Sequence, residues 1–289
     1  MVMNFITPIS SKTTEKSGQL KFQGCTNLII IPTKAIIAVL RLEAIYIFIL
    51  GEILKLLITC MTIYPLKLDK NMKRLTKIDP QEIEQASFTI IEKEFLDETA
   101  IDPSTLDADT FKVIQRVIHA TGDFSFAHNL VFHSQAIVKG IEAVRSGKNI
   151  YCDVTMAASG ISEKMLADFG GKVICHINDQ TIAEEARREG KTRTETALAR
   201  IEDENIGIIS IGNAPTALVK AMQLIENGRI TPELLVGVPV GFVNAAESKA
   251  ILMEKDYPFI TCKGRKGGTP VAVAIVNALI RLAAEPVQG

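Results

Sequence analysis

One of the four histidines in this sequence stands in a setting that suits proton transfer. His119 lies near the end of a predicted helix, three residues after Arg116 in the run Arg116-Val-Ile-His-Ala-Thr-Gly122, so both side chains share one helix face. The C-terminal end of a helix favours a charged imidazolium, while the neighbouring arginine opposes it. Such a balance lets a histidine give or accept a proton near neutral pH. From the residues alone, a histidine that only caps the last helix carbonyls is the better explanation.

The other histidines and the remaining reactive side chains give weaker signals. His128 and His133 lie in a stretch of mixed polarity, and we expect structural roles for both. His176 falls at the end of a predicted strand, where it either lines a pocket or bonds to a neighbouring group. The sequence has no HxxxH, HExxH or GxSxG motif and no cysteine beside a convincing base. It therefore predicts no metal site and no covalent nucleophile.

A glycine-rich basic loop, Gly264-Arg-Lys-Gly-Gly268, precedes the last predicted helix. Loop N–H groups and a helix N-terminus attract anions, as in a phosphate cradle. However, the loop is neither GxGxxG nor GxxxxGK[ST], and residues 154–161 lack the dinucleotide fingerprint. A ligand with several carboxylates fits this chemistry equally well. The basic side chains that would serve it are Lys263, Arg265, Lys266 and Arg193, each of which is, taken alone, an ordinary surface charge.

A repeated pattern of a short apolar run, a polar or glycine-rich loop and a helix predicts the fold. Continuous apolar runs of this kind are typical of buried parallel strands, because helices cover both faces of the sheet. The five runs are 149–153, 172–177, 206–211, 234–238 and 258–262. We therefore expect an α/β protein, a three-layer α/β/α sandwich around a five-stranded parallel sheet. Crossover connections bring the loops after all five strands to the same carboxyl edge, where ligands bind in such sheets.

Three helices precede this pattern and one ends it. Apolar spacing predicts a helix over 80–96, with Asp79 as its N-cap and Pro80 at its first position. A second helix over 108–120 is closed by Gly122. The third covers 135–145, with Ser134 as its cap, and the last covers 270–284.

Composition bounds the class of protein. A chain of 289 residues with 47% hydrophobic content can bury one full core. The formal net charge of −1, with no basic stretch interleaved with aromatics, gives no case for nucleic acid. Five scattered cysteines without a CxxC pair favour reduced thiols in the cytoplasm.

The first 71 residues differ from the rest. Their apolar runs are interrupted by Pro32, Arg41, Glu52 and other charges, so no run reaches the roughly 20 residues of a membrane span. A signal-peptide pattern is absent, and the charges do not gather on one face as in an amphipathic surface anchor. We expect residues 1–71 to be an extension outside the catalytic core, and residues 72–289, beginning at Met72, to form the working domain.

From Asp79 onward the chain resembles the precorrin-8X methylmutase family of cobalamin biosynthesis. The resemblance rests on an ordered set of motifs, which is far more specific than any one of them. These are Ala86-Ser-Phe88, Arg116-Val-Ile-His-Ala-Thr-Gly122, Cys152-Asp153 with Met156 and Gly160-Ile161, Thr192-Arg193, Ile211-Gly-Asn-Ala-Pro-Thr-Ala-Leu218, Gly237-Val-Pro-Val-Gly-Phe-Val243 with Ala246-Glu-Ser-Lys249, and Gly264-Arg-Lys-Gly-Gly268. The amino-terminal extension is not part of the family pattern.

The resemblance implies a flavodoxin-like fold, a homodimer and an isomerase that needs no cofactor or metal. Its members move a methyl group from C-11 to C-12 of the corrin ring of precorrin-8 or cobalt-precorrin-8, giving hydrogenobyrinic or cobyrinic acid. By the same matching, His119 is the proton donor, which reverses the simpler interpretation given above. The matched substrate-binding positions are Ser87, Arg116, Arg193, Ser162, Asn213 and Gly241.

Two other functions compete with this one. A non-catalytic corrinoid-binding or carrier protein needs the same pocket, but it can dispense with His119. A flavin or nucleotide protein on the same scaffold is disfavoured by the missing phosphate fingerprint. We expect a corrinoid as the partner, with neither nucleic acid nor membrane.

Overall fold

The computed structural model describes residues 82–286 without a break, together with Asp79, residues 19–20, 31–32, 49, 51–53 and 55. The chain divides into two units, Met1–Lys77 and Ile78–Gly289. In the first, β1 (Gln19–Leu20) pairs antiparallel with β2 (Ile31–Pro32). The predicted separation of residues 1–71 from the catalytic core falls mostly outside the described residues and stays a prediction. No helix within the described part is long and apolar enough to cross a membrane.

The second unit is built on one six-stranded sheet of order β3-β8-β7-β6-β4-β5. All five predicted strands are present and pair in parallel. They are β4 (Asn149–Cys152), β5 (Val173–Ile174), β6 (Ile206–Ile211), β7 (Leu234–Gly237) and β8 (Phe259–Cys262). Their spatial order, second-first-third-fourth-fifth along the chain, is the flavodoxin order. The α/β prediction is confirmed, and the point where the strand order reverses lies between β4 and β6.

The sixth strand was not predicted. β3 (Leu130–Phe132) pairs antiparallel with β8 at the edge of the sheet. Its three residues are too short to show a period, and His128 and His133 flank it with polar groups. An edge strand also needs only one partner, so its sequence carries a weaker apolar signal than a central strand.

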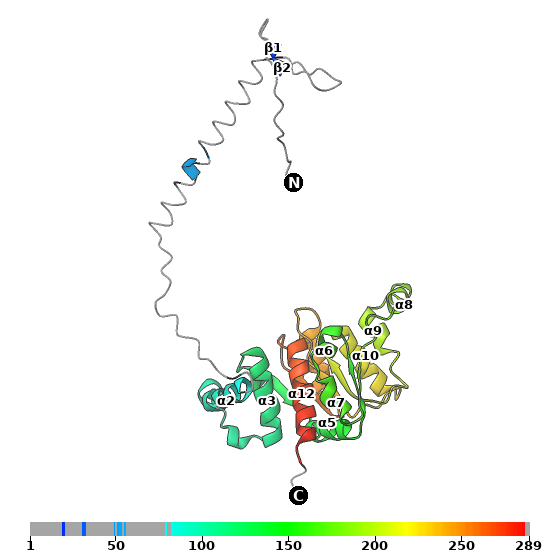
Figure 1. Ribbon diagram of the computed structural model, residues 1–289. Helices are drawn as coiled ribbons and strands as arrows, with labels where there is room; N and C mark the ends of the chain where they lie inside the picture. The colour runs from blue at the N-terminus through cyan, green and yellow to red at the C-terminus, as the bar shows by residue number, and fades with distance from the viewer. Residues whose placement is uncertain are drawn as a thin grey trace. The chain divides into compact units, whose positions relative to one another are not determined.

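Alternate residues of each strand enter two separate cores, which gives the expected three layers (Figure 1). Within β6, Ile208 packs into one core, whereas Ile209 and Ile211 pack into the other. Four helices cover the first face: α5 (Ala136–Arg145), α6 (Thr155–Gly160), α7 (Glu163–Ala167) and α12 (Thr269–Ala284). Three cover the second face: α9 (Arg193–Leu198), α10 (Pro215–Glu226) and α11 (Ala245–Met253). The short helix α8 (Ile182–Glu189) packs on α9.

The helices before the sheet extend this sandwich on the α12 side. They are α2 (Ile83–Thr99), the 3-10 turn η1 (Pro103–Thr105), α3 (Ala108–Thr121) and α4 (Phe126–Asn129). Helix α3 runs antiparallel to α12, because Lys112 near its start bonds Glu285 (2.6 Å), while Asp123 after its end bonds Lys266 (2.6 Å). The end of α3 that carries His119 therefore lies at the carboxyl edge of the sheet.

Two predicted helix caps are wrong, although the helices are present. Helix α2 begins at Ile83 with Glu82 as its N-cap, since the Glu82 N–H bonds the Asp79 carbonyl (2.9 Å) in a separate turn. At α5 the N-cap is Gln135 rather than Ser134, and His133 Nδ1 accepts the Gln135 N–H (3.3 Å). Both α3 and α12 match their predictions within one residue, and Gly122 closes α3 in the left-handed conformation (φ 65°) as expected.

Candidate functional site

His119 is held by two residues of the neighbouring helix. Its Nδ1 lies 2.8 Å from Ser87 Oγ, a hydrogen bond whose donor depends on the histidine tautomer. The Phe88 ring meets the imidazole edge-on, with ring centroids 5.2 Å apart. Ser87 and Phe88 are consecutive on α2, so the packing of α2 on α3 alone brings both to the histidine. The His119 side chain is exposed, and no described residue hydrogen-bonds its Nε2.

Arg116 does not stand next to His119 as an unpaired charge. Its guanidinium bonds Glu84 Oε1 (2.8 Å) and lies 4.9 Å from the centroid of the Phe88 ring. Burial acts to raise the pKa of the Glu84 carboxyl, but the Arg116 hydrogen bond and the charges of Arg116, Arg281 and His119 outweigh it and lower that pKa. Because a carboxylate neutralises the arginine, the repulsion that the sequence predicts between Arg116 and His119 is weakened.

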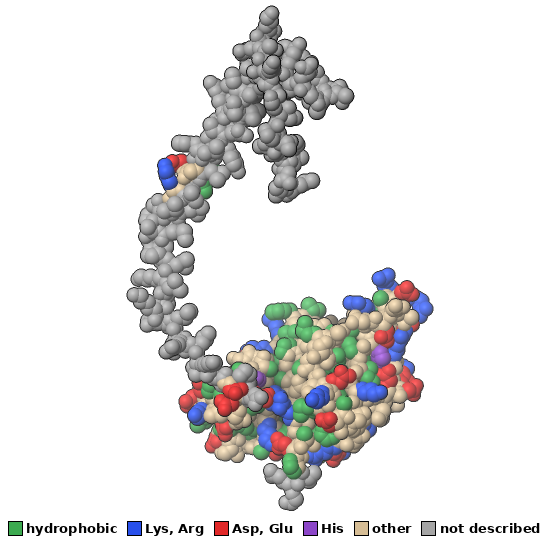
Figure 2. Space-filling view, viewed as in Figure 1, with side chains coloured by type: hydrophobic (Ala, Val, Ile, Leu, Met, Phe, Trp, Pro, Cys, Tyr) green, Lys and Arg blue, Asp and Glu red, His purple; other side chains and the backbone are tan. Residues whose placement is uncertain are grey.

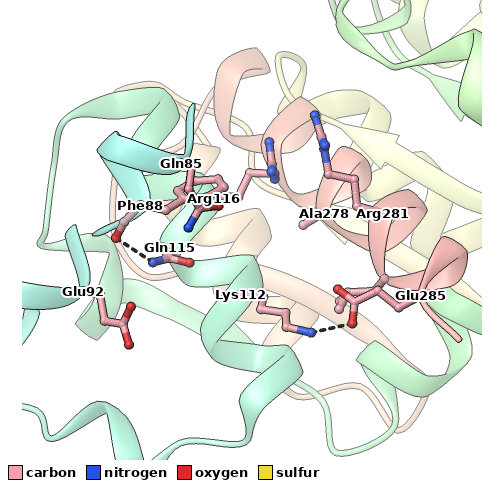
Figure 3. A pocket seen from close by; sticks show the side chains of 10 residues that line it. Gln85, Phe88, Glu92, Lys112, Gln115, Arg116, Ala278, Arg281 and Glu285 are labelled. Atoms are coloured by element: carbon pink, nitrogen blue, oxygen red, sulfur yellow. Dashed lines mark hydrogen bonds and ion pairs between the residues drawn. The ribbon is translucent and has the colours of Figure 1, made fainter. Parts of the chain in front are cut away.

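A cavity of about 310 Å³ opens beside this cluster, between α2, α3 and α12 (Figure 3). Its walls are formed by Gln85, Phe88, Glu92, Lys112, Gln115, Arg116, Ala278, Arg281, Leu282 and Glu285. Several of its polar groups are already paired, since Lys112 bonds Glu285 (2.6 Å) and Gln115 donates to the Phe88 carbonyl (3.0 Å). The cavity thus borders the histidine cluster, but several of its polar side chains are already bonded to neighbouring helices.

Asp153 occupies the point where the strand order reverses. The residue directly follows β4 and is fully buried, and its carboxylate accepts the backbone N–H groups of Gly212, Asn213 and Ala214 at 2.9 to 3.1 Å. Burial raises the pKa of this carboxyl, while the three N–H donors oppose that shift. These donors are the groups that would bind a phosphate before α10. An internal carboxylate therefore takes the place of an external anion at this loop.

The glycine-rich loop between β8 and α12 is tied down from several sides. The Gly268 N–H donates to the Val238 carbonyl (2.7 Å), and the Gly241 N–H donates to the Arg265 carbonyl (3.2 Å). Beneath the loop the fully buried Lys249 donates to the Lys266 carbonyl and to Cys262 Sγ (3.4 Å). The backbone of the loop is therefore held in place, and of its basic side chains Lys266 is bonded to Asp123 and Ser125.

Large apolar side chains are exposed at the same edge of the sheet. Phe242 is 83% exposed, Val243 77% and Met156 71%, although each follows the carboxyl end of a strand. The guanidinium of Arg265 lies 5.2 Å from the centroid of the Phe242 ring. Hydrophobic side chains gather at the top of this unit in Figure 2, above α12. An apolar surface with an arginine beside it suits a flat hydrophobic ligand with acidic substituents.

The structure brings together three of the predicted site residues, Ser87, Arg116 and His119. The others make no described contact with this cluster: Asn213 and Gly241 lie in loops after strands, Ser162 between α6 and α7, and Arg193 in α9. Arg193 is the exposed first residue of α9. Asn213 is also exposed, and its backbone N–H donates to the Asp153 carboxylate. The Ser162 N–H donates to Asn277 Oδ1 (2.9 Å). Gly241 has φ 151°, which favours glycine.

The remaining reactive groups have structural partners. His176 bonds Glu204 (2.7 Å) and Asp179 (3.0 Å), which is the second of its two predicted alternatives. His133 accepts a backbone N–H, as described for α5. Within the described residues, no cluster of three or more metal-ligating side chains occurs, and Cys152, Cys175 and Cys262 are free thiols.

Sequence reasoning missed the roles of Asp153, Lys249 and Asp123. Asp153 ends an apolar run immediately before a loop, a position where a buried acid must find backbone donors. Lys249 lies in a helix that carries Ala245 and Leu252 on its buried side. That spacing was the available signal that this lysine is covered.

Comparison with known proteins extends over the same unit. The chain matches the family model described as precorrin-8X methylmutase over residues 82–282. It is 41% identical over 207 residues to the cobalt-precorrin-8 methylmutase of Priestia megaterium, covering 71% of this chain and 89% of that protein. It is 43% identical over 203 residues to the enzyme of the same name from Salmonella typhimurium, covering 70% and 94%. The solved structure of the precorrin-8x methyl mutase from Thermus thermophilus matches with TM-score 0.63 and 36% identity, over 71% of this chain and 96% of that one.

Proposed function

Because this chain belongs to the precorrin-8X methylmutase family, we propose that it is the isomerase that moves a methyl group from C-11 to C-12 of precorrin-8 or cobalt-precorrin-8. The products are hydrogenobyrinic acid or cobyrinic acid. The enzyme class rests on the family match over residues 82–282. The observation that carries the mechanism is the His119–Ser87 pair, whose two residues lie far apart in sequence and are 2.8 Å apart at the carboxyl edge.

His119 is the proposed proton donor, acting through Nε2. Ser87 engages Nδ1, so in the imidazolium, and in the neutral form that accepts from Ser87, the proton sits on Nε2. Protonation of the macrocycle draws electron density from the conjugated ring and eases the methyl shift. The Phe88 ring packs against the imidazole edge and limits its rotation. Because the shift is intramolecular and transfers no electrons, we propose that it needs no cofactor.

The exposed apolar side chains and nearby cations provide the proposed binding surface for the corrinoid. Phe242, Val243 and Met156 offer contact to the flat ring. Arg193 and Arg265 are the proposed partners of the peripheral carboxylates, because an arginine binds a carboxylate with two parallel hydrogen bonds. Ser162, Asn213 and Gly241 complete the proposed contacts in the strand-end loops, and Arg116 contributes from α3. We further propose a homodimer located in the cytoplasm, with no nucleic-acid or membrane partner.

An absorbance time course of the full chain with precorrin-8, and separately with cobalt-precorrin-8, tests this function. We expect the wild type to form product and the His119→Ala variant to lose at least about 100-fold in kcat, the scale of one general acid. A His133→Ala variant controls for loss of an imidazole elsewhere, since His133 lies outside the cluster.

The carrier alternative predicts a different result. A non-catalytic corrinoid-binding protein would shift the substrate spectrum without forming product, and His119→Ala would behave like the wild type. If the wild type converts either precorrin-8 or cobalt-precorrin-8 and His119→Ala does not, the carrier alternative is excluded.

A further inference from the structure

Lys266 lies where three separate segments meet. Its ammonium donates to Asp123 Oδ2 (2.6 Å) and to Ser125 Oγ (2.7 Å), just beyond the end of α3. Its backbone carbonyl accepts from the buried Lys249 ammonium, and it lies 3.0 Å from the Cys262 thiol sulfur. A single residue thus ties the glycine-rich loop both to the sheet interior and to the helix that carries His119.

Asp123 transmits this contact to the end of α3. Its second carboxylate oxygen, Oδ1, accepts the Ser125 N–H (2.9 Å), and its own N–H donates to Thr121 Oγ1 (3.3 Å). The Thr121 hydroxyl in turn donates to the Val117 carbonyl (2.8 Å) inside α3. The hydrogen-bonded chain from Lys266 therefore ends within one turn of His119.

The two direct contacts of the His119 ring come from α2. Ser87 and Phe88 belong to α2, which contacts α3 but neither the glycine-rich loop nor the strands through any described hydrogen bond. Together with the Lys266–Ser125 hydrogen bond and the packing of Ile118 into the core, the Lys266–Asp123 pair holds the end of α3 against the carboxyl edge. Its distance is short, yet both side chains are partly exposed at 53% and 33%. An ion pair this exposed contributes little to stability, so its clearest effect is on geometry.

We propose that Lys266 and Asp123 are positioning residues that hold the His119 imidazole in register with the strand-end loops that bind the substrate. This inference rests on the proposed function for its kinetic consequence. A shift of about 1 Å at a reacting group reduces the rate by about 100-fold, so a clamp at the end of α3 affects turnover more than affinity. A direct role for Lys266 as a ligand for a substrate carboxylate is the competing explanation.

The test compares Lys266→Met, Asp123→Asn and the double variant in the full chain. Positioning predicts that each single change lowers kcat by about 10-fold or more with KM within about 2-fold, and that the double variant is no worse than either single one. Direct binding by Lys266 predicts instead that only Lys266→Met raises KM, while Asp123→Asn leaves kcat unchanged. The latter result overturns the proposal.

A matched control and a second readout keep folding and activity apart. Lys255→Met removes the ion pair between Lys255 and Glu226, which is of similar length (2.5 Å). This pair joins the ends of α10 and α11 on the other face of the sheet, so the variant is expected to leave kcat unchanged. Proton–nitrogen NMR of the imidazoles, assigned with His119→Ala, reports the His119 environment without any substrate. We expect Lys266→Met and Asp123→Asn to shift the His119 signals in the same way, with unaltered melting temperature. Unchanged His119 signals refute the positioning role even if the wild type shows no mutase activity, whereas shifted signals with an inactive wild type refute only the proposed function.

Discussion

At the scale of residues, the His119–Ser87 contact occupies Nδ1, so the proposed mechanism assigns proton donation to Nε2. Replacing Ser87 with alanine removes the partner of Nδ1 and lets the imidazole change tautomer and rotate. We expect Ser87→Ala to lower kcat by about 10-fold, less than the roughly 100-fold or greater loss expected when the general acid itself is removed. We expect its melting temperature to stay near that of the wild type, because Ser87 is not buried. Steady-state kinetics and a thermal melt measure both.

Thr89→Ala provides the control for the serine variant. Its hydroxyl also lies on α2 and, among the described residues, bonds only the Gln85 carbonyl of the same helix (2.9 Å). Equal losses in the two variants would mean that α2 itself was disturbed and that the Ser87 hydroxyl has no role in orienting His119.

Lys249 gives a pH-dependent prediction. Burial lowers the pKa of this ammonium below 10.5, although the facing Cys262 opposes the shift. Between the lowered value and 10.5 the unfolded chain binds more protons than the folded one, so the free energy of unfolding gained from this group rises with pH. We will compare the free energies of unfolding of the wild type and of Lys249→Met, measured with urea. We expect the wild-type value minus the variant value to increase as pH rises from neutral toward 10.5. The same comparison in a Cys262→Ala background removes the contribution of the thiol. A difference in free energy of unfolding that falls with pH would contradict the lowered pKa of Lys249.

At the scale of elements, the strands of the sheet were predictable and their finer boundaries were not. The parallel strands β4, β6, β7 and β8 are buried on both faces, so an apolar run marks each of them, and β6 matches its predicted bounds at both ends. The edge strand β5 is only partly buried and covers two residues of its predicted run 172–177. The start of α2 depends on a turn at Asp79, and the cap of α5 depends on His133 reaching the Gln135 N–H. Such competition among nearby donors and acceptors leaves no periodic trace in a sequence.

The candidate site likewise contains some contacts that the sequence indicates and others that it does not. Arg116 and His119 lie on one helix, so their spacing alone places them together, whereas the contact with Ser87 joins residues 32 positions apart. The motif resemblance supplied Ser87 before the structure did. The Glu84 partner of Arg116 and the Lys266–Asp123 pair are tertiary ion pairs, which neither spacing nor a motif indicates.

Alanine substitutions in the loop after β8 measure how far the backbone at the carboxyl edge can move. Gly267 has φ 145°, and a Cβ added there would lie 2.3 Å from the Val238 carbonyl oxygen, so Gly267→Ala must displace backbone. Gly264 has φ 70° with nothing within 4 Å of its would-be Cβ. We expect Gly264→Ala to destabilise by about 1 kcal/mol through its left-handed backbone, and Gly267→Ala by more than about 2 kcal/mol through backbone strain. Denaturant unfolding measures both, and equal effects would mean that the loop relaxes freely.

At the scale of the whole molecule, we expect the second unit to fold and to act without the residues that precede it. The family match lies within residues 82–282, and the second compact unit, Ile78–Gly289, contains both cores and every proposed site residue. A chain that starts at Met72 retains this unit with a short lead. We therefore expect residues 72–289 to melt within roughly 2 °C of the full chain, because a loss of 1 kcal/mol would shift a unit of this size by about 2–4 °C.

The same truncation separates two functions for the amino-terminal residues. If they only precede the catalytic unit, residues 72–289 convert the substrate with kcat and KM within about 2-fold of the full chain, and light scattering gives the same number of subunits for both. A truncated protein that folds with an unchanged melting temperature but loses turnover would assign residues 1–71 a part in catalysis. A truncated protein that changes its subunit number would assign them a part in assembly. The predicted homodimer is tested in the same experiment, since a mass of one chain for both proteins would exclude it.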